Sequence, residues 1–313
     1  MTEQPVDPDV TALLARLGPP VPVADVTADE MRKGMRDAID AFTRDAEPIA
    51  VHEVVDEVVP GRGGGIPVRV YRPRTPTAVL VYLHGGAWVA GDIDTHEFVT
   101  RRFSRDTGAT VVSVDYRLLP EHPFPAQFDD SWDAVSWAAG LHPDLPLLVA
   151  GDSAGGTLTG CVALRARDEG GPRIDGQVLV YPATDDDLDT PSMLGDTGDP
   201  RITRDDLRHH FHRYAPPGTG TPYAYPGQAA SLAGLPPAVL VIAGHDRLRS
   251  AEEDFARRLR EAGVPVTVQL DPELVHGWID FAPCIPAADR AFTRLTHTVS
   301  HLIRTGTTPS WPS

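Results

Sequence analysis

The sequence has few cysteines and no long apolar run. Cys161 and Cys284 are its only cysteines, which excludes a disulfide framework. We expect two buried free thiols rather than one bridge. No apolar stretch approaches the roughly 18–20 residues that span a membrane. The first residues lack a basic start followed by an apolar core, so we expect no secretory signal and a cytoplasmic protein.

Positive charge is also scarce. The 313 residues include 28 Lys+Arg against 44 Asp+Glu, which gives a formal net charge of −16. This balance argues against a nucleic-acid partner and against binding to an anionic membrane surface. A chain of this length buries most of its unfolded surface, so it needs neither disulfides nor metals to fold.

Residues 1–45 are predicted to be mostly helical. Leucines at helical spacing indicate a first helix that is capped by Asp9 and ends at Gly18. A second helix is expected at about 27–45, with an apolar side. Neither helix belongs to the strand pattern that follows.

Apolar strands alternate with helical patterns over the rest of the chain. The segments 51–59 and 66–72 flank a glycine-rich turn and predict a β-hairpin. Strand–helix alternation predicts an α/β fold with a mostly parallel sheet covered by helices. Further strands are expected at 78–83, 109–116, 146–151, 176–181, 238–244 and 264–270. Helices are expected at about 94–106, 126–140, 154–169, 250–262 and 284–304.

One segment interrupts this alternation. Residues 182–236 contain loops and a short helical stretch around 203–214. An insertion between two sheet strands usually lies over the strand ends. We therefore expect a catalytic core at 46–181 and 237–313, with 182–236 as an insertion above it.

The clearest local motif is Gly151-Asp152-Ser153-Ala154-Gly155. It fits the pattern G-x-S-x-G and lies between an apolar strand and a helix, as that motif requires. The sharp turn demands tiny neighbours and exposes the Ser153 hydroxyl at the sheet edge. The adjacent helix N-terminus favours developing negative charge there. The motif predicts Ser153 as a nucleophile.

A serine hydroxyl needs a base, and two later residues fit the required order. Asp246 follows the strand at 238–244, and His276 follows the strand at 264–270. Parallel strands place both at the same sheet edge as Ser153. We expect His276 to take the serine proton and Asp246 to orient the imidazole. His245 is a neighbouring alternative, disfavoured because it directly precedes the acid.

The segment His84-Gly85-Gly86-Ala87-Trp88 follows the strand at 78–83. A tetrahedral intermediate needs N–H donors aimed at its oxygen, and a glycine-rich loop can turn its amides inward. The residue after the nucleophile, Ala154, is a second source of such a donor.

Together these motifs resemble a known family. HGGAW, DYRLLPEHPFPAQFDD (115–130), GDSAGG (151–156), GHDRL and HGW are similar to the hormone-sensitive-lipase-like, bacterial family IV carboxylesterases of the α/β-hydrolase superfamily. The resemblance implies an eight-stranded sheet and a helical cap built from 1–45 and 182–236. It also implies a homodimer and ester hydrolysis by Ser153, Asp246 and His276.

The resemblance further implies an oxyanion hole formed by the amides of Gly86, Ala87 and Ala154. Ala87 departs from the family, which usually has glycine there, so a methyl group enters the site. The turn before His276, residues 271–275, also lacks the family's usual glycine.

The sequence therefore predicts a serine esterase that cleaves short- to medium-chain acyl esters, small-molecule substrates, through an acyl-enzyme. Trp88, Phe211 and Tyr214 are candidate pocket walls. Amide, formamide or lactone hydrolysis and acyl transfer use the same triad and stay open. A dehydratase and a non-catalytic small-molecule receptor are further alternatives.

No cofactor or metal is expected. His209, His210 and His212 lack a metalloprotease pattern, and Asp185–Asp187 lack the spacing of a calcium loop. The segment 115–130 is interpreted as structural. In it Asp115 is expected to pair with Arg117, and Glu121 with His122 to support the oxyanion loop.

Overall fold

The computed structural model describes residues 4–216, 218–219 and 221–308. Parts of the predicted segments lie outside these ranges. They are residues 1–3 of the N-terminal segment, 217 and 220 of the insertion, and 309–313 of the core.

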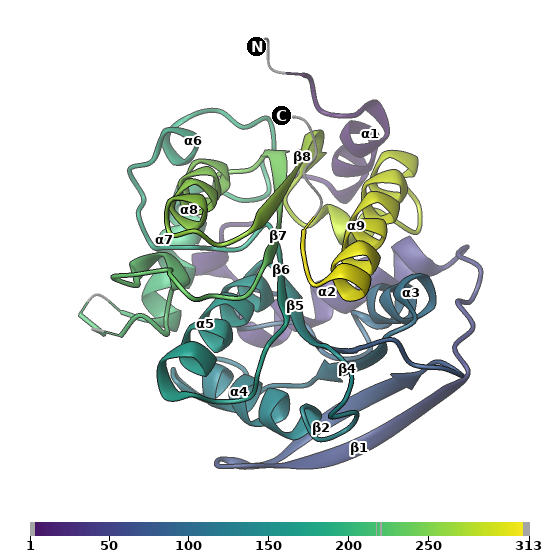
Figure 1. The fold of residues 1–313 in the computed structure, drawn as a ribbon. Helices are drawn as coiled ribbons and strands as arrows, with labels where there is room; N and C mark the ends of the chain where they lie inside the picture. Colours follow the sequence, from purple (N-terminus) through teal and green to yellow (C-terminus); the bar gives the residue numbers. More distant parts are fainter. Residues whose placement is uncertain (1–3, 217, 220, 309–313) are drawn as a thin grey trace.

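Eight strands form one twisted sheet in the order β1-β2-β4-β3-β5-β6-β7-β8 (Figure 1). The hairpin of β1 (Glu53–Gly61) and β2 (Gly64–Arg72) is antiparallel, and β2 is also antiparallel to β4. The other pairs are parallel. Their strands are β3 (Val79–Leu83), β4 (Thr110–Val114), β5 (Leu147–Asp152), β6 (Gly176–Val180), β7 (Ala238–His245) and β8 (Val266–Val275). The predicted mostly parallel, eight-stranded α/β sheet is confirmed.

Helices cover both faces of this sheet (Figure 1). α3 (Glu97–Thr107) and α9 (Pro286–Thr305) lie together on one face. On the other face lie α4 (Ala126–Ala138), α5 (Ala154–Glu169) and α8 (Arg249–Glu261). Every residue of β3 to β6 is buried, which explains why these strands are continuous apolar runs.

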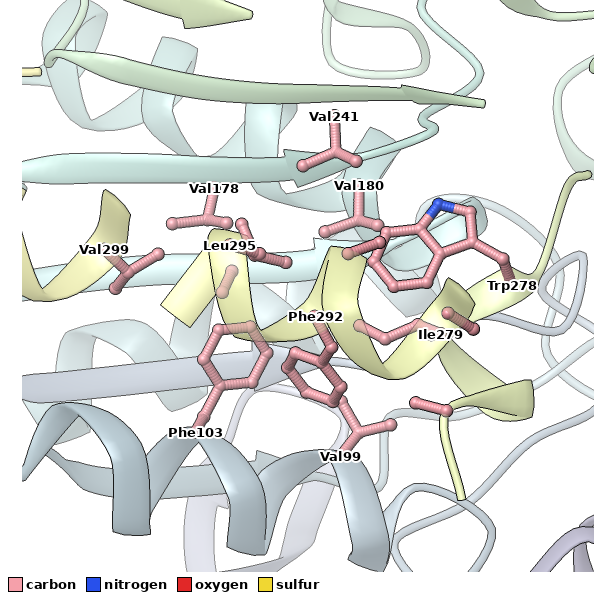
Figure 2. Packing of buried hydrophobic residues seen from close by; sticks show 14 of the residues in the cluster. Val99, Phe103, Val178, Val180, Val241, Trp278, Ile279, Phe292, Leu295 and Val299 are labelled. Atoms are coloured by element: carbon pink, nitrogen blue, oxygen red, sulfur yellow. The ribbon is translucent and has the colours of Figure 1, made fainter. Parts of the chain in front are cut away.

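The core between the sheet and the α3–α9 pair is closely packed (Figure 2). Phe103 of α3 and Phe292 of α9 meet edge to face, with ring centroids 5.2 Å apart. Valines of β6 and β7 cover them from the sheet side, among them Val178 and Val241. This layer fixes the strand ends from which the site is built.

The two N-terminal helices form as predicted, with one correction. α1 (Pro8–Leu17) is capped by Asp7 rather than Asp9, because the Asp7 carboxylate accepts the amides of Asp9 and Val10. α2 (Ala28–Thr43) begins with a capping box between Thr27 and Glu30. A short 3-10 helix, η1 (Val23–Asp25), precedes α2.

The insertion contains three short elements. α6 (Pro191–Leu194) precedes α7 (Arg204–Tyr214), which Thr203 and Asp206 cap, and η2 (Pro226–Gln228) follows. The Asp206 carboxylate also accepts the amide of Val23, 2.9 Å away. That bond ties the insertion to the N-terminal segment.

Strand β8 is longer than the sequence suggests. It continues to Val275, although we expected a turn over 271–275. A register shift against β7 accommodates Pro272, which has no N–H to donate. The Pro272 carbonyl lies where a side chain at Gly244 would otherwise stand, so Gly244 is required for this close approach. A 3-10 helix, η3 (Trp278–Phe281), follows.

Both cysteines are free, but only Cys161 is buried. Cys284 is exposed because it lies in the turn between η3 and α9, so the prediction of two buried thiols is wrong for this residue. Among the described residues, no helix is both long enough and apolar enough to cross a membrane.

Two valines on strands test where the stability resides. Val241→Ala removes two methyl groups from a fully buried strand and should lower the free energy of unfolding by about 2 kcal/mol. Val58 on β1 is 72% exposed, and Val58→Ala should change it by less than about 0.5 kcal/mol. Urea unfolding followed by circular dichroism measures both. Equal losses would contradict this assignment of the core.

Candidate active site

Ser153 lies at a strained turn between β5 and α5. Its backbone has φ 51° and ψ −119°, a positive φ that only a few non-glycine residues adopt here. A side chain at Gly155 would collide with the carbonyl oxygen of Leu83, and one at Gly151 with the carbonyl of Gly155. The turn is therefore held by backbone contact on both sides, which explains the two small residues of the motif.

The hydroxyl of Ser153 faces His276. Ser153 Oγ and His276 Nε2 are 2.9 Å apart, and His276 Nδ1 lies 2.6 Å from Asp246 Oδ2. The carboxylate fixes the tautomer, because Nδ1–H donates to Asp246 and Nε2 is left to accept the serine proton. The other oxygen of Asp246 accepts the amide of Leu248 at 2.9 Å. The structure thus brings the three predicted residues into one hydrogen-bonded line.

Both partners of the serine are buried. Asp246 is 2% exposed and His276 is 9% exposed. Burial opposes the charged form of His276, but Asp246 outweighs it and raises the pKa of His276 above the ordinary 6.5. Such an imidazole is well suited to accept a proton near neutral pH.

His245 points elsewhere. Its Nδ1 lies 2.7 Å from the carbonyl of Thr197, and its Nε2 lies 2.9 Å from the carbonyl of Gln4. The ring therefore connects the insertion to the N-terminal segment and makes no contact with Ser153 among the described residues.

The loop after β3 turns its backbone toward Ser153. Gly86, Ala87 and Trp88 have φ of 114°, 54° and 60°. The amides of Gly86, Ala87 and Ala154 donate to no other described group, and all three residues line the same cavity as Ser153. Their N–H groups are free to meet an oxygen of a bound molecule.

The carboxylate of Asp152 anchors this loop. Its Oδ1 accepts the amide of Gly85 at 3.0 Å and the hydroxyl of Tyr82 at 2.7 Å. His96 Nε2 lies 3.5 Å away. Burial opposes ionisation of Asp152, but the charge of His96 and these donors keep its pKa low. The same carboxylate raises the pKa of His96 to about 9 against the effect of burial, so the two form a buried ion pair.

No motif in the sequence pointed to His96 or Tyr82. Both lie in segments that we interpreted as regular structure, a strand for Tyr82 and the predicted start of a helix for His96. A buried tyrosine hydroxyl and a buried imidazole need partners. That rule would have marked both side chains once their burial was known.

The segment 115–130 supports the loop in a different way than expected. Arg117 forms a two-pronged ion pair with Asp130, at 2.7 and 2.8 Å, rather than with Asp115. Glu121 reaches the loop through Arg32 of α2, with which it forms an ion pair and which donates to the carbonyl of Val89. The long Arg32 side chain comes from the N-terminal segment, so the pattern within 115–130 alone could not predict this contact.

A cavity of about 310 Å³ opens above Ser153. Its walls come from three parts of the chain: the core, the N-terminal segment and the insertion. Trp88 and Phe211 line it, whereas Tyr214 stacks behind Trp88 with ring centroids 3.8 Å apart. The apolar part of the lining also includes Val23, Met31, Met35, Ala183, Ile202, Leu207 and Leu248.

The three histidines of α7 do not gather around a common point. His210 is buried and lines the cavity, and burial lowers its pKa to about 4, so it is neutral. Within the described parts of the chain, no group of three His, Cys, Asp or Glu residues is arranged to hold a metal ion.

Comparison with known proteins places the chain in a family. A family model described as alpha/beta hydrolase fold matches residues 80–280. The esterase LipI of Mycobacterium tuberculosis is 40% identical over 298 residues, covering 88% of this chain and 92% of the relative. The carboxylesterase NlhH of the same organism is 44% identical over 242 residues, covering 73% and 76%.

A solved structure supports the same family assignment. A hyperthermophilic esterase from the archaeon Pyrobaculum calidifontis superimposes with a TM-score of 0.87 at 34% identity, covering 96% of this chain and 99% of that one. The likeness therefore extends over the sheet, the N-terminal helices and the insertion. On these matches the chain belongs to the α/β-hydrolase family, in its hormone-sensitive-lipase-like branch.

Proposed function

We propose that this protein is a serine carboxylesterase that hydrolyses short- to medium-chain acyl esters through an acyl-enzyme. The observation that carries the proposal is the hydrogen-bonded line of Ser153, His276 and Asp246 at the floor of the cavity. The names of the relatives agree, because LipI and NlhH are an esterase and a carboxylesterase.

In the first half of the reaction, His276 Nε2 accepts the proton of Ser153 while Oγ attacks the ester carbonyl carbon. The carbonyl electron pair moves to oxygen, and the amides of Gly86, Ala87 and Ala154 stabilise that oxyanion. The intermediate collapses, the bond to the alcohol oxygen breaks, and His276 returns its proton to the departing alcohol.

In the second half, water repeats the attack on the acyl-serine. His276 takes one proton from the water, and the same amides stabilise the new oxyanion. On collapse the bond between the acyl carbon and Ser153 Oγ breaks, Oγ takes the proton back from His276, and the carboxylic acid leaves. Asp246 stays ionised throughout, because its part is to hold the Nδ1–H tautomer and to stabilise the imidazolium.

We further propose that residues 1–45 and 182–236 act together as a cap over this chemistry. Met31 and Met35 of α2 and Leu207 and Phe211 of α7 line the same cavity as Ser153. Such walls exclude water and leave an apolar space for the acyl or alcohol group. At about 310 Å³ the cavity is at the small end for ligand sites, which supports short and medium chains.

Removal of the nucleophile or the base should abolish turnover. Ser153→Ala and His276→Ala should each lower kcat by about 10⁴-fold or more on p-nitrophenyl butyrate, because the triad acts as a unit. Ser136→Ala is the matched control, since that hydroxyl bonds the Trp132 carbonyl in α4, away from the cavity. Turnover by Ser153→Ala comparable to the control would refute the nucleophile assignment.

The pH dependence of kcat/KM should report the ionisation of His276. Only the neutral ring can accept the serine proton, and Asp246 raises its pKa, so kcat/KM should fall with a midpoint above 6.5 as pH is lowered. Asp246→Asn should move that midpoint downward and lower kcat by about 10⁴-fold. A profile that stays flat to pH 5 rules out a histidine base.

The preference for acyl-chain length should report the size of the pocket. Across p-nitrophenyl esters of two to twelve carbons, kcat/KM should peak among short and medium chains, because the lining of the cavity closes around a limited volume. The measurement is the full series with wild type, with Ser153→Ala as background. A steady rise to twelve carbons contradicts a closed pocket.

A further inference from the structure

Asp280 is a carboxyl group in the cavity that the proposed chemistry does not use. It belongs to η3, four residues after His276, and lines the cavity together with Ser153 and Gly86. The carboxylate that orients His276 is Asp246, so Asp280 is a second acid in the same cavity that takes no part in this hydrogen-bonded line.

The carboxyl group of Asp280 accepts no hydrogen bond and joins no ion pair with another described residue. Its Oδ1 is closed off from solvent and unpaired, whereas the side chain as a whole is half-buried, so Oδ2 is the oxygen that a molecule in the cavity can reach. An ionised carboxylate can accept several hydrogen bonds, and leaving it without any is costly in a buried place. Such an arrangement persists where a ligand or water supplies the missing donor.

Other charged groups on the cavity wall already have partners. Arg201 holds both oxygens of Asp199 and the carbonyl of His276. Asp206 holds Thr203 and the amide of Val23. Asp280 is thus the acidic side chain of this wall that is left to meet a bound molecule.

We infer that Asp280 is a specificity residue that accepts a hydrogen bond from a hydroxyl or ammonium group carried by the substrate close to its ester. The preferred substrates are then hydroxy- or amino-substituted esters rather than plain alkyl esters. The rest of the lining is mostly apolar, so one donor group on an otherwise apolar substrate satisfies the whole site. This inference rests on the proposed esterase function.

The charged groups around Asp280 affect its pKa, and this pKa determines the pH at which the assay is run. Burial and the negative charge of Asp152 raise the pKa of Asp280, His96, Arg201 and His276 oppose them, and the net pKa is about 7. At pH 8 the carboxyl group is therefore mostly ionised and acts as a pure acceptor. The higher pH also favours the neutral form of His276, which is the form that can accept the serine proton.

The test compares substrates that differ by one donor. On the acyl side, p-nitrophenyl butyrate is paired with its 3-hydroxybutyrate and 3-aminobutyrate analogues. On the alcohol side, propyl acetate is paired with 3-hydroxypropyl acetate. At pH 8 the wild type should favour the donor-bearing member of at least one pair by about tenfold in kcat/KM. The pair in which kcat/KM differs identifies the donor group and shows whether Asp280 contacts the acyl side or the alcohol side of the ester.

Variants assign the preference to Asp280. Asp280→Leu should bring the ratio for that pair to about one, and Asp280→Asn should keep part of a hydroxyl preference while losing an ammonium preference. Glu252→Gln is the matched control, because Glu252 is a buried carboxyl group with no partner and does not line the cavity. It should keep the wild-type ratio. Circular dichroism checks folding, and Asp280→Asn carries the test if the leucine variant does not fold.

The two proposals fail in different ways. Ratios near one in every wild-type pair, or a preference that Asp280→Leu and Asp280→Asn retain unchanged, overturn the role of Asp280 and leave the esterase standing. Absence of any Ser153-dependent turnover, in a protein that is folded, overturns the esterase function and this inference with it.

Discussion

The contact between two strand ends determines the rest of the site. β3 and β5 are paired so that Leu83 lies beside Gly151, and the Leu83 carbonyl occupies the space that a side chain at Gly155 would need. The turn that carries Ser153 and the loop that carries Gly86 therefore leave the sheet side by side. No flexible hinge separates the nucleophile from the amides that would receive the oxyanion. The strain at Ser153 is held by this backbone contact, together with the packed core beneath it.

A buried charge pair completes that arrangement. Asp152 joins the end of β5 to the loop after β3, and His96 supplies the counter-charge from the start of α3. A single buried carboxylate would be costly at this depth, whereas a paired and hydrogen-bonded one can be kept. The nucleophile turn, the oxyanion loop and α3 are consequently one electrostatic unit. A side chain that touches no substrate can thus control the position of atoms that do.

Much of the fold and of the candidate site could be predicted from the sequence, because these parts depend on patterns within short segments. The apolar strands, the strand–turn–helix around Ser153 and the positions of Asp246 and His276 after their strands all follow from local pattern and the parallel sheet. The walls of the cavity do not. Met31, Met35 and Ile202 carry no signal beyond apolarity, and their meeting depends on the Asp206–Val23 bond between segments 183 residues apart. Arg32 reaches Glu121, 89 residues away, and Val89, 57 residues away, which no local pattern shows. The local pairing of Asp115 with Arg117 was wrong because Arg117 binds Asp130 instead.

The apolar lining of the cavity and its proposed acceptor therefore come from different parts of the chain. Most of the apolar lining comes from the N-terminal segment and the insertion, whose side chains can be exchanged without changing the line of Ser153, His276 and Asp246. The acceptor that we propose comes from the core, because Asp280 lies on the short helix that follows His276 and is placed by the same strand as the base. A change in the cap can then alter the size of an accepted group while the acceptor stays at a constant distance from the reacting ester. Size selection and donor recognition are separable in this fold because they are built on different segments.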